Sequence, residues 1–513
     1  MNGRALRSLL LGVLYNAIAV ALVWRVGYVL SAHLTRANLE YDEKFFLWTG
    51  WSFLKGATPY RDFHAFKPPM SYLLNAAGIK LFGLDDLAYR RLFQMLAVGS
   101  ILSLLAALLK RGVDRVVAAS LALLVAGLYF ESAFHDSSLN DTESLGLAFY
   151  IMGVAAFVWQ ARRRWIGEAL GSALLAAAVL TKEPFALCVL PTWLAFLFDR
   201  DHPLRIKSLV AYAKPTLLGA GLVIAAIFIH LAVSGGLPYY VRVIRQYEPF
   251  ARTYCVSLGS FTPGPFCAEQ KQNWNHLAND FLSFPRFAAW TPLFVAAYAA
   301  PLRRRALHIA AVTVAVVGAL YSTTLGHCYW RHYYVMAFAG AVLLGVVGSI
   351  SLSKRIDAAR TASLRWWVRS FFVVTVFFTL WPRYDVEREH LATYRPAKYG
   401  GVPADLVDFV RSHSADTDYV LVTGDPAINV MADRRAPSVG PNAFLDELLV
   451  TYPGLTDQEK LAPLRAELQR TMPKIVYLDP DREYRRARFM NTAIRPFLDA
   501  NGYREVRSHM WMR

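Results

Sequence analysis

The sequence contains only four cysteines among its 513 residues, and no two of them are spaced as CxxC. It also lacks any cysteine–histidine spacing typical of a structural zinc site, so it gives no support for a zinc-stabilised fold. Cys255 and Cys267 share one polar loop, whereas Cys188 and Cys328 lie at or near the ends of apolar runs. If that loop is extracytoplasmic, we expect Cys255 and Cys267 to form a disulfide.

Acidic residues are scarce, with 38 Asp and Glu against 55 Lys and Arg, which gives a formal net charge of +17. This excess does not indicate a nucleic-acid partner, because basic and acidic residues balance within 383–513. The positive charge lies in residues 1–382, mostly in short clusters between apolar runs. That distribution is typical of the cytoplasmic loops of a membrane protein.

Internal repeats, low-complexity tracts and a glycine-rich phosphate loop are also missing from the sequence. Transporters and lipid flippases usually show inverted repeats or paired helices broken by glycine and proline. We therefore keep a polyprenyl-lipid or solute transporter only as the alternative function. A non-catalytic scaffold whose C-terminal region binds a partner is a further alternative.

Long hydrophobic runs are abundant, and 55% of the residues are hydrophobic. Repeated runs of about 20 residues predict a mainly α-helical, polytopic membrane protein in contact with the lipid bilayer. We expect about eleven transmembrane helices, with a fourth that ends before Arg162. The other expected spans are about 8–30, 87–109, 115–131, 167–181, 184–198, 213–233, 286–301, 307–324, 334–350 and 366–381.

Every basic cluster between these spans falls on one side of the membrane, which predicts a cytoplasmic N-terminus. Residues 1–382 then form a transmembrane domain with periplasmic loops at 31–86 and 234–285. Residues 383–513 form a periplasmic soluble domain.

The composition of the C-terminal domain predicts a small α/β fold. DYVLVTGDP and KIVYLDP each read as a short buried strand closed by a turn, and DQEKLAPLRAELQR reads as a helix between them. Asp425 and Asp479 follow these strands. We interpret both as turn residues, since no glycine-rich phosphate loop accompanies them.

The stretch from Tyr41 to Leu74 follows the first apolar run and is too polar to cross a bilayer. Its aromatic residues suit a juxtamembrane helix that lies in the interface with its aromatic face toward the lipid. Two adjacent carboxylates, Asp42 and Glu43, stand at its head. The basic residues at its tail are Arg61, His64 and Lys67. The alternative interpretation is an ordinary amphipathic linker between two helices.

Further polar clusters fall on the same expected outer side of the membrane. Their members are Asp136, Asp141 and Glu143, then Lys182 and Glu183, and finally His327, Arg331, His332, Tyr333 and Tyr334. A charge near the hydrocarbon boundary costs roughly 1–3 kcal/mol unless it is paired or solvated, so these three clusters and the one in the first loop together suggest a shared polar cavity. Each one alone could equally be an interfacial anchor or a local salt bridge.

A carboxylate that faces several cations suits group transfer from a phosphate-linked donor. The cations would neutralise the negative charge that accumulates on the departing phosphate. The carboxylate would take the proton from the attacking hydroxyl.

The arrangement of these residues resembles that of the bacterial GT-C glycosyltransferases. The resemblance rests on Asp42-Glu43 after the first span, on YRDFHAFKPPMSYLLNAAGIKLFG, on Arg90-Arg91 and on the LTKEP hairpin. It covers roughly residues 8–350 and is strongest to the protein-mannosyltransferase and lipid A aminoarabinose-transferase branch. It implies an inverting transfer from a polyprenyl-phosphate-sugar donor to an extracytoplasmic acceptor: lipid A or lipopolysaccharide, another cell-envelope glycan, or a protein.

The resemblance also implies roles for individual residues. Asp42 matches the loop-one acid, the general base, and Glu43 matches a group that positions the acceptor or a metal. Lys67 and Lys182 match lysines near the donor phosphate. The further donor-phosphate ligands implied before the tenth span are Arg331, His332 and Tyr333. The acceptor or sugar ligands implied are Arg61, His64, Asp141 and Glu143.

One position departs from that pattern. The aminoarabinose transferases carry Glu directly before the lysine that Lys67 matches, a position linked to metal, whereas this sequence has Phe66. His64 could take its place together with Glu43. A divalent cation is therefore an open expectation, and no other cofactor is expected.

Overall fold

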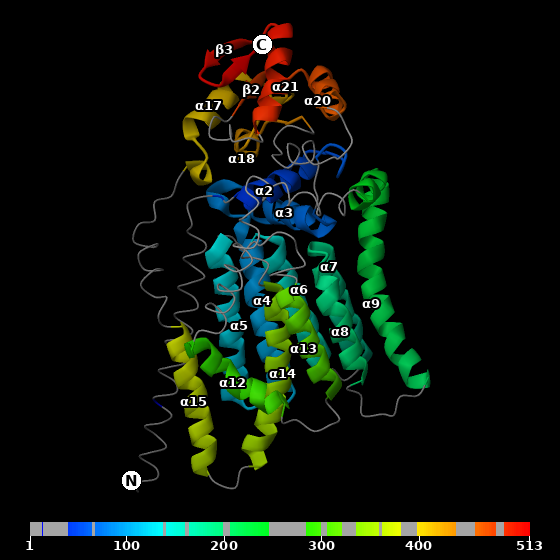
Figure 1. The fold of residues 1–513 in the computed structure, drawn as a ribbon, viewed down its shortest axis with the longest axis vertical. Coiled ribbons are helices and arrows are strands. Elements are labelled where there is room, and N and C mark those ends of the chain that lie inside the picture. Colours follow the sequence, from blue (N-terminus) through cyan, green and yellow to red (C-terminus); the bar gives the residue numbers. More distant parts are fainter. Residues whose placement is uncertain are drawn as a thin grey trace. The chain divides into compact units, whose positions relative to one another are not determined.

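The computed structural model describes most of the chain and is predominantly helical (Figure 1). The residues it describes are 13, 39, 41–63, 67–136, 140–159, 164–198, 206–245, 284–298, 305–320, 335–358, 362–380, 398–437, 457–478 and 487–513. The chain divides into two compact units. The first comprises 1–36, 93–224 and 267–394, and the second comprises 37–92, 225–266 and 395–513.

The first unit is a bundle of apolar helices. Its described helices are α4 (Arg90–Lys110), α5 (Arg115–Asp136), α6 (Thr142–Val158), α7 (Arg164–Thr181), α8 (Phe185–Phe198), α9 (Ile206–Val233), α12 (Phe284–Tyr298), α13 (Arg305–Leu320), α14 (Val335–Ala358) and α15 (Ala362–Leu380). The start of α4 and the end of α9 belong to the second unit. Within the bundle, α6 packs on α7, and α14 packs on both α12 and α13.

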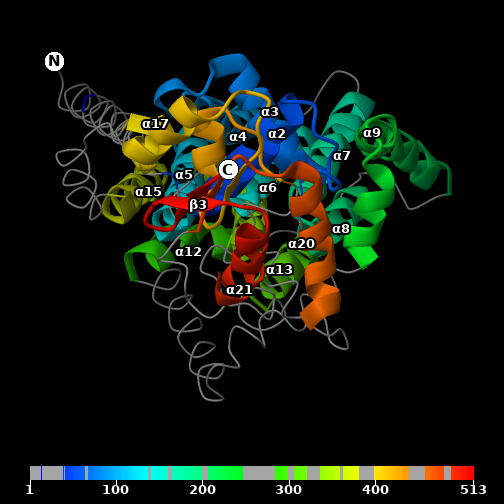
Figure 2. The same ribbon diagram turned by 90° about the horizontal axis from the view of Figure 1, so that it is seen from above.

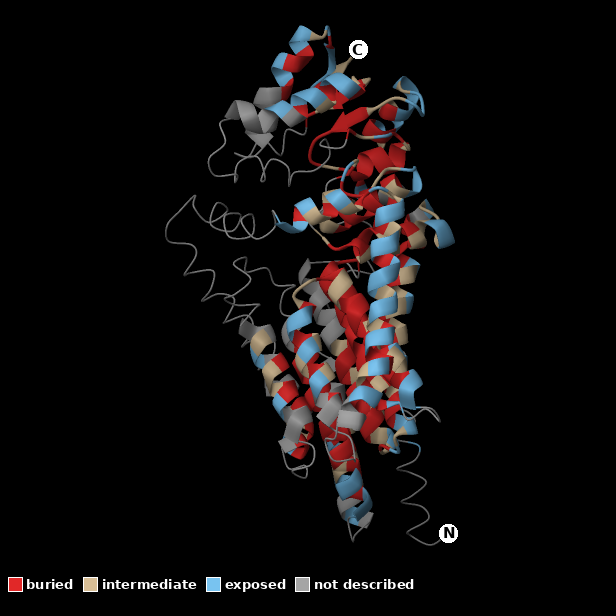
Figure 3. Ribbon diagram, turned by 90° about the vertical axis from the view of Figure 1, so that its right-hand side faces the viewer, coloured by how far each residue is buried: buried red, intermediate tan, exposed pale blue. Residues whose placement is uncertain are grey.

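Each described bundle helix coincides with one of the spans expected from the sequence, with ends that differ by up to eight residues. Among the residues that the structure describes, four segments are long and apolar enough to cross a membrane by length and composition: Arg90–Lys110, Arg164–Thr181, Val210–Val233 and Phe338–Ala358. Exposed apolar side chains on α9, such as Leu217 and Val233, agree with a lipid-facing surface. Figure 3 shows helices with exposed residues along one side and buried residues along the other. The expected first span, about 8–30, lies outside the described residues apart from residue 13.

The second unit contains the expected first-loop helix, α2 (Tyr41–Leu54), and α3 (Pro69–Phe82), which packs on it. Pro68 and Pro69 begin α3, since a proline in the first helical turn leaves no missing hydrogen bond. Gly50 lets the two helices cross closely, because a Cβ there would lie 2.5 Å from the Cβ of Asn75.

The expectation that the aromatic face of this helix lies against lipid is wrong. Phe45, Phe46, Trp48 and Trp51 of α2 are each at most 5% exposed within the protein. The reason is that α2 packs both on α3 and on α18 (Ala427–Ala432) of the C-terminal region. The aromatic residues thus contribute to the core of the second unit.

The described part of the C-terminal region contains both strands and helices. Its strands are β1 (Val420–Val422), β2 (Ile475–Tyr477), β3 (Arg504–Arg507) and β4 (Met510–Met512), in the order β1-β2-β4-β3. The two strands expected from the sequence are β1 and β2, and they pair in parallel. The β3–β4 hairpin, which the sequence analysis did not identify, adds an antiparallel edge.

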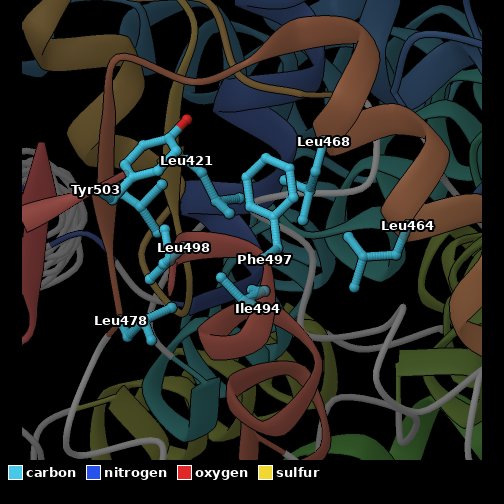
Figure 4. Packing of buried hydrophobic residues seen from close by; sticks show 9 residues of the cluster. Leu421, Leu464, Leu468, Leu478, Ile494, Phe497, Leu498 and Tyr503 are labelled. Carbon is cyan, nitrogen blue, oxygen red and sulfur yellow. The ribbon is translucent and has the colours of Figure 1, made fainter. Parts of the chain in front are cut away.

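Helices complete this α/β region. They are α17 (Ala404–His413), α18, α20 (Asp457–Thr471) and α21 (Ala487–Ala500), with short 3-10 turns η1 (Asp85–Leu87) and η6 (Lys398–Gly401) also in the second unit. Figure 2 shows α20 and α21 beside each other in the view from above. Their apolar faces meet at a buried cluster with Leu464, Leu468, Ile494 and Phe497, shown in Figure 4. This cluster covers β1 and β2 and gives the region a hydrophobic core of its own.

Candidate functional site

Asp42 lies in the first turn of α2, where the unpaired backbone N–H groups of the helix favour a negative charge. Its side chain is only partly buried. Within the described part of the chain it makes no hydrogen bond or ion pair, so its carboxylate is available to a ligand. A partly exposed carboxylate of this kind can accept a proton from a bound ligand.

Glu43, the next residue, is held in a different way. Its side chain is completely buried, and its two oxygens lie 2.7 Å and 2.6 Å from the Nε and Nη2 atoms of Arg90. The hydroxyl of Tyr89 also donates to Glu43 at 2.6 Å. This bidentate pair joins α2 to the start of α4, and it sets the orientation of the helix turn that carries Asp42.

A second set of contacts joins α2 to both ends of α18. Lys44 Nζ lies 2.5 Å from Asp425 Oδ2, before α18. After α18, the carboxylate of Asp433 accepts from Trp51 Nε1 at 3.2 Å and lies 2.8 Å from Lys55 Nζ. We call these three interactions the α2–α18 contact. Lys44 and Trp51 lie on the same helix as Asp42 and Lys55 directly follows it, so the C-terminal region helps to position this helix.

Asp433 and Asp425 lie at the two ends of α18. Asp433 has φ +56°, in the left-handed region that non-glycine residues seldom adopt, and it forms the C-cap of α18. Asp425, as expected, is a turn residue: it follows Gly424, and its Oδ1 accepts from the backbone N–H of Ala427. Its other oxygen binds Lys44, which the sequence did not indicate. Asp479 lies outside the described residues.

The tail of the first loop holds two of the expected basic residues. Arg61 pairs with Asp62 through Nε and Nη2, at 2.7 and 2.8 Å. Burial alone would raise the pKa of Asp62, but the hydrogen bonds from Arg61 and from the backbone of Thr58 outweigh it and hold that pKa below its usual value. Lys67, directly before α3, is partly buried, and its carbonyl accepts a hydrogen bond from Tyr60.

In the first unit the structure brings together two expected site residues that are far apart in sequence. Lys182 Nζ lies 2.6 Å from Glu143 Oε1, and both side chains are at most 3% exposed. Lys182 sits in the tight connection between α7 and α8, where the amide of Phe185 donates to its carbonyl. Glu143 lies in the first turn of α6. This buried ion pair joins the LTKEP hairpin to α6.

Asp141, another expected ligand, has a structural role in the same place. It is the N-cap of α6, and its carboxylate accepts from the backbone and hydroxyl of Ser144. Asp141 is 7% exposed. Its carboxylate therefore helps to set the direction of the turn that carries Glu143.

Several expected site residues lie outside the described residues. They are His64, Arg331, His332, Tyr333, Cys255 and Cys267. Their expected roles, in donor binding, acceptor binding and the disulfide, stay predictions.

The expected metal site can be examined only at Glu43. Both of its oxygens already accept hydrogen bonds from Arg90 and Tyr89, so a cation there would face a buried guanidinium. Among the residues with a described placement, no group of three His, Cys, Asp or Glu side chains is arranged to hold a metal ion. Glu43 therefore does not fit a metal ligand in this arrangement.

Comparison with solved structures addresses the fold. The chain is similar to ArnT from Cupriavidus metallidurans in the apo state, with a TM-score of 0.54 and 14% identity over 94% of each chain. The chain has the GT-C fold. It is also similar to the oligosaccharyltransferase of Archaeoglobus fulgidus, solved with Zn and sulfate, with a TM-score of 0.50 and 15% identity. That alignment covers 89% of this chain and 67% of the other.

The GT-C resemblance seen in the sequence is confirmed by a second comparison. Residues 66–231 match the family described as dolichyl-phosphate-mannose-protein mannosyltransferase. The matched region contains Lys67, Glu143 and Lys182. A comparison with curated proteins finds no match.

Sequence reasoning missed the partners that immobilise the acidic pair. The sequence analysis uses Arg90 only as part of the resemblance, and it does not identify Tyr89, Asp425 or Asp433 as partners of the first loop. A buried Arg at the head of an apolar helix is a usable signal, because such a charge needs a partner. The contacts with Asp425 and Asp433 leave no local signal, since more than 375 residues separate the partners.

Proposed function

We propose that this protein is an integral membrane glycosyltransferase that transfers a sugar from a polyprenyl-phosphate donor to an extracytoplasmic acceptor, with inversion. The observation that carries the proposal is the contrast within the acidic pair. Glu43 is buried and paired, while Asp42 beside it is partly exposed and has no described partner. A helix that is immobilised by one carboxylate and offers the next one to a ligand suits general-base catalysis.

In the proposed reaction, Asp42 accepts the proton of the acceptor hydroxyl. The hydroxyl oxygen attacks the anomeric carbon of the donor sugar, and the bond from that carbon to the phosphate oxygen breaks. The polyprenyl phosphate leaves with the electron pair. Lys67 and Lys182, with Arg331, His332 and Tyr333, are proposed to neutralise its charge. Glu43 acts through Arg90 as a positioning residue.

The match of residues 66–231 to the mannosyltransferase family supports a sugar donor on a lipid phosphate. The acceptor class comprises lipid A or lipopolysaccharide, another cell-envelope glycan, or a protein. The charge of Lys182 is compensated by Glu143, whose Oε1 lies 2.6 Å from the lysine Nζ. A donor phosphate would therefore have to share the lysine with that carboxylate.

The test is transfer of labelled sugar from a purified polyprenyl-phosphate donor by the protein in detergent. We expect Asp42→Asn to lower turnover by about 100-fold or more, the usual scale for a general base, with an unchanged unfolding temperature. Asp85→Asn is the matched control, since Asp85 is an exposed aspartate of the same unit. Near-normal turnover in Asp42→Asn would remove the base assignment. A transporter or scaffold would form no glycosylated product at all.

We also propose a bacterial inner-membrane location with a cytoplasmic N-terminus and a periplasmic C-terminal region. The positions of the basic clusters support this orientation. In intact cells, a membrane-impermeant maleimide should label Arg504→Cys in the C-terminal region but not Asp357→Cys beside a basic cluster. Both positions are exposed in the structure. The reverse pattern would invert the proposed topology.

A further inference from the structure

A polar cavity of about 230 Å³ lies within the second unit, between the end of α2 and the C-terminal region. Lys55 and Arg61 line it from the first loop. Arg435 lines it from the segment that follows α18, and Arg470 lines it from α20. The lining carboxylates are those of Asp62 and Glu467, so cations outnumber carboxylates by four to two. Asp433, which pairs with Lys55, adds one negative charge near the cavity.

The guanidinium groups of two of the arginines are each held by a neighbouring carboxylate in the same way. Arg61 binds Asp62 through Nε and Nη2, and Arg470 binds Glu467 through the same two atoms at 2.8 and 2.7 Å. Each carboxylate thereby orients a guanidinium and leaves the Nη1 edge outside the pair. The hydroxyl of Tyr419, which also lines the cavity, faces Arg470. These groups are oriented hydrogen-bond donors.

Arg435 supplies a cation without a carboxylate. Its side chain is exposed, and it forms no ion pair with any residue whose placement is described. Its backbone is held in place, because its carbonyl accepts from Val420 N at 2.8 Å and it forms a bridge with Tyr419. An uncompensated cation beside two oriented guanidinium groups is the arrangement that binds an oxyanion.

We propose that this cavity binds a phosphate or carboxylate group carried by a saccharide. The oxyanion would accept hydrogen bonds from Arg435 and from the outer edges of Arg61 and Arg470. The cavity volume suits one charged sugar unit rather than a long chain.

The position of the cavity indicates which substrate such a group would belong to, a step that rests on the proposed function. Asp42 lies at the beginning of α2 and Lys55 lies directly after its end. At 1.5 Å per residue, the two are about 20 Å apart along the helix. This separation is longer than one sugar unit. The cavity thus selects an extended, anionic acceptor that is held at one end while a distant hydroxyl reaches Asp42.

The test is binding of glucose 1-phosphate, glucuronate, glucose and inorganic phosphate to the purified full chain, measured by isothermal titration calorimetry. We expect the two anionic sugars to bind and glucose to bind at least tenfold more weakly. Arg435→Ala should weaken binding of the anionic sugars about tenfold, the scale of one charge-assisted hydrogen bond. Arg504→Ala, which removes an exposed arginine outside the cavity, should leave it unchanged. Arg435→Lys should retain part of the affinity.

Other results would overturn the proposal. Equal weakening by Arg435→Ala and Arg504→Ala would mean that only net charge matters. Inorganic phosphate that binds as tightly as glucose 1-phosphate would mean that the cavity recognises a free anion and no saccharide. Asp42→Asn should bind all four probes normally. If the protein transfers no sugar but binds the anionic sugars through Arg435, the proposed function fails and the cavity proposal stands. If it transfers sugar but shows no Arg435-dependent binding, only the cavity proposal fails.

Discussion

Glu43 is a completely buried carboxylate that neutralises a buried guanidinium, and its environment explains why Asp42 and Glu43 differ although they are neighbours. Replacement by Gln would leave Arg90 charged and uncompensated. We expect Glu43→Gln to lower the free energy of unfolding by about 3–5 kcal/mol, the usual cost of breaking a buried pair from one side. Thermal unfolding in detergent measures it. In Glu43→Gln/Arg90→Met, where no buried charge is left alone, much of that loss should be recovered. An unchanged unfolding temperature in Glu43→Gln would contradict the positioning role.

Asp62 gives a pH-dependent prediction at the same scale. Its pKa in the folded protein is below the unfolded value of about 3.9, so its stabilising contribution is present above that value and is lost as pH falls through the folded pKa. Asp62→Asn should therefore be less stable than the wild type at pH 7. The difference should shrink as the pH is lowered below about 4. Unfolding temperatures of both proteins across this range test it, and a constant difference would refute it.

At the scale of the element, Gly50 determines how closely α2 can lie on α3. An added Cβ would meet the Cβ of Asn75 and the backbone of Ala76, and backbone atoms cannot easily move away. We expect Gly50→Ala to destabilise the protein by about 1–3 kcal/mol through overpacking. Gly99→Ala is the control, since a Cβ at that position of α4 meets no atom within 4 Å. That variant should be neutral or slightly more stable because alanine favours the helix. Equal effects would contradict the packing argument.

The buried pair between Lys182 and Glu143 links the α7–α8 connection to α6 and can be tested as a unit. Lys182→Met should destabilise strongly, because it removes the cation that compensates the buried carboxylate of Glu143. Lys182→Met/Glu143→Gln should regain stability but should not regain sugar transfer, if Lys182 also binds the donor phosphate. Recovery of both stability and transfer in the double variant would assign the pair a purely structural role. Unfolding temperature and transfer rate, measured on the same preparation, distinguish the two.

At the scale of the whole molecule, the second unit combines the first loop with residues 395–513. The α2–α18 contact makes the C-terminal region a support for the helix that carries Asp42. We expect removal of residues 395–513 to expose the buried aromatic side chains of α2 and to abolish protection of its amides from hydrogen exchange. Lys44→Met, which breaks one ion pair with Asp425, should have a smaller effect in the same direction. Full protection of α2 in the truncated protein would show that the region folds separately from it.

The positions of most apolar helices could be predicted from the sequence, because a span requires a long run of apolar residues that is visible locally. The β1 and β2 strands were also predicted from local sequence, because each is a short apolar run followed by turn residues. The tight LTKEP connection was predicted because it separates two apolar runs. The β3–β4 hairpin was missed, since both strands are short and every residue of β3 is exposed. The aromatic face of α2 was assigned to lipid because composition shows that a face is apolar and does not show what covers it.

The amino-acid sequence by itself determined a polytopic, helical membrane protein with an α/β region after it, and it singled out Asp42, Lys67, Glu143 and Lys182. Hydrophobicity and charge clusters act over a few residues, so these features can be read along the chain. Only the tertiary structure decided that Glu43 is paired while Asp42 is free to bind, and that Lys182 meets Glu143. It alone assembled the cationic cavity from the first loop and the C-terminal region. Such contacts depend on burial and on partners hundreds of residues away, where a side chain's chemistry is set by what folds against it.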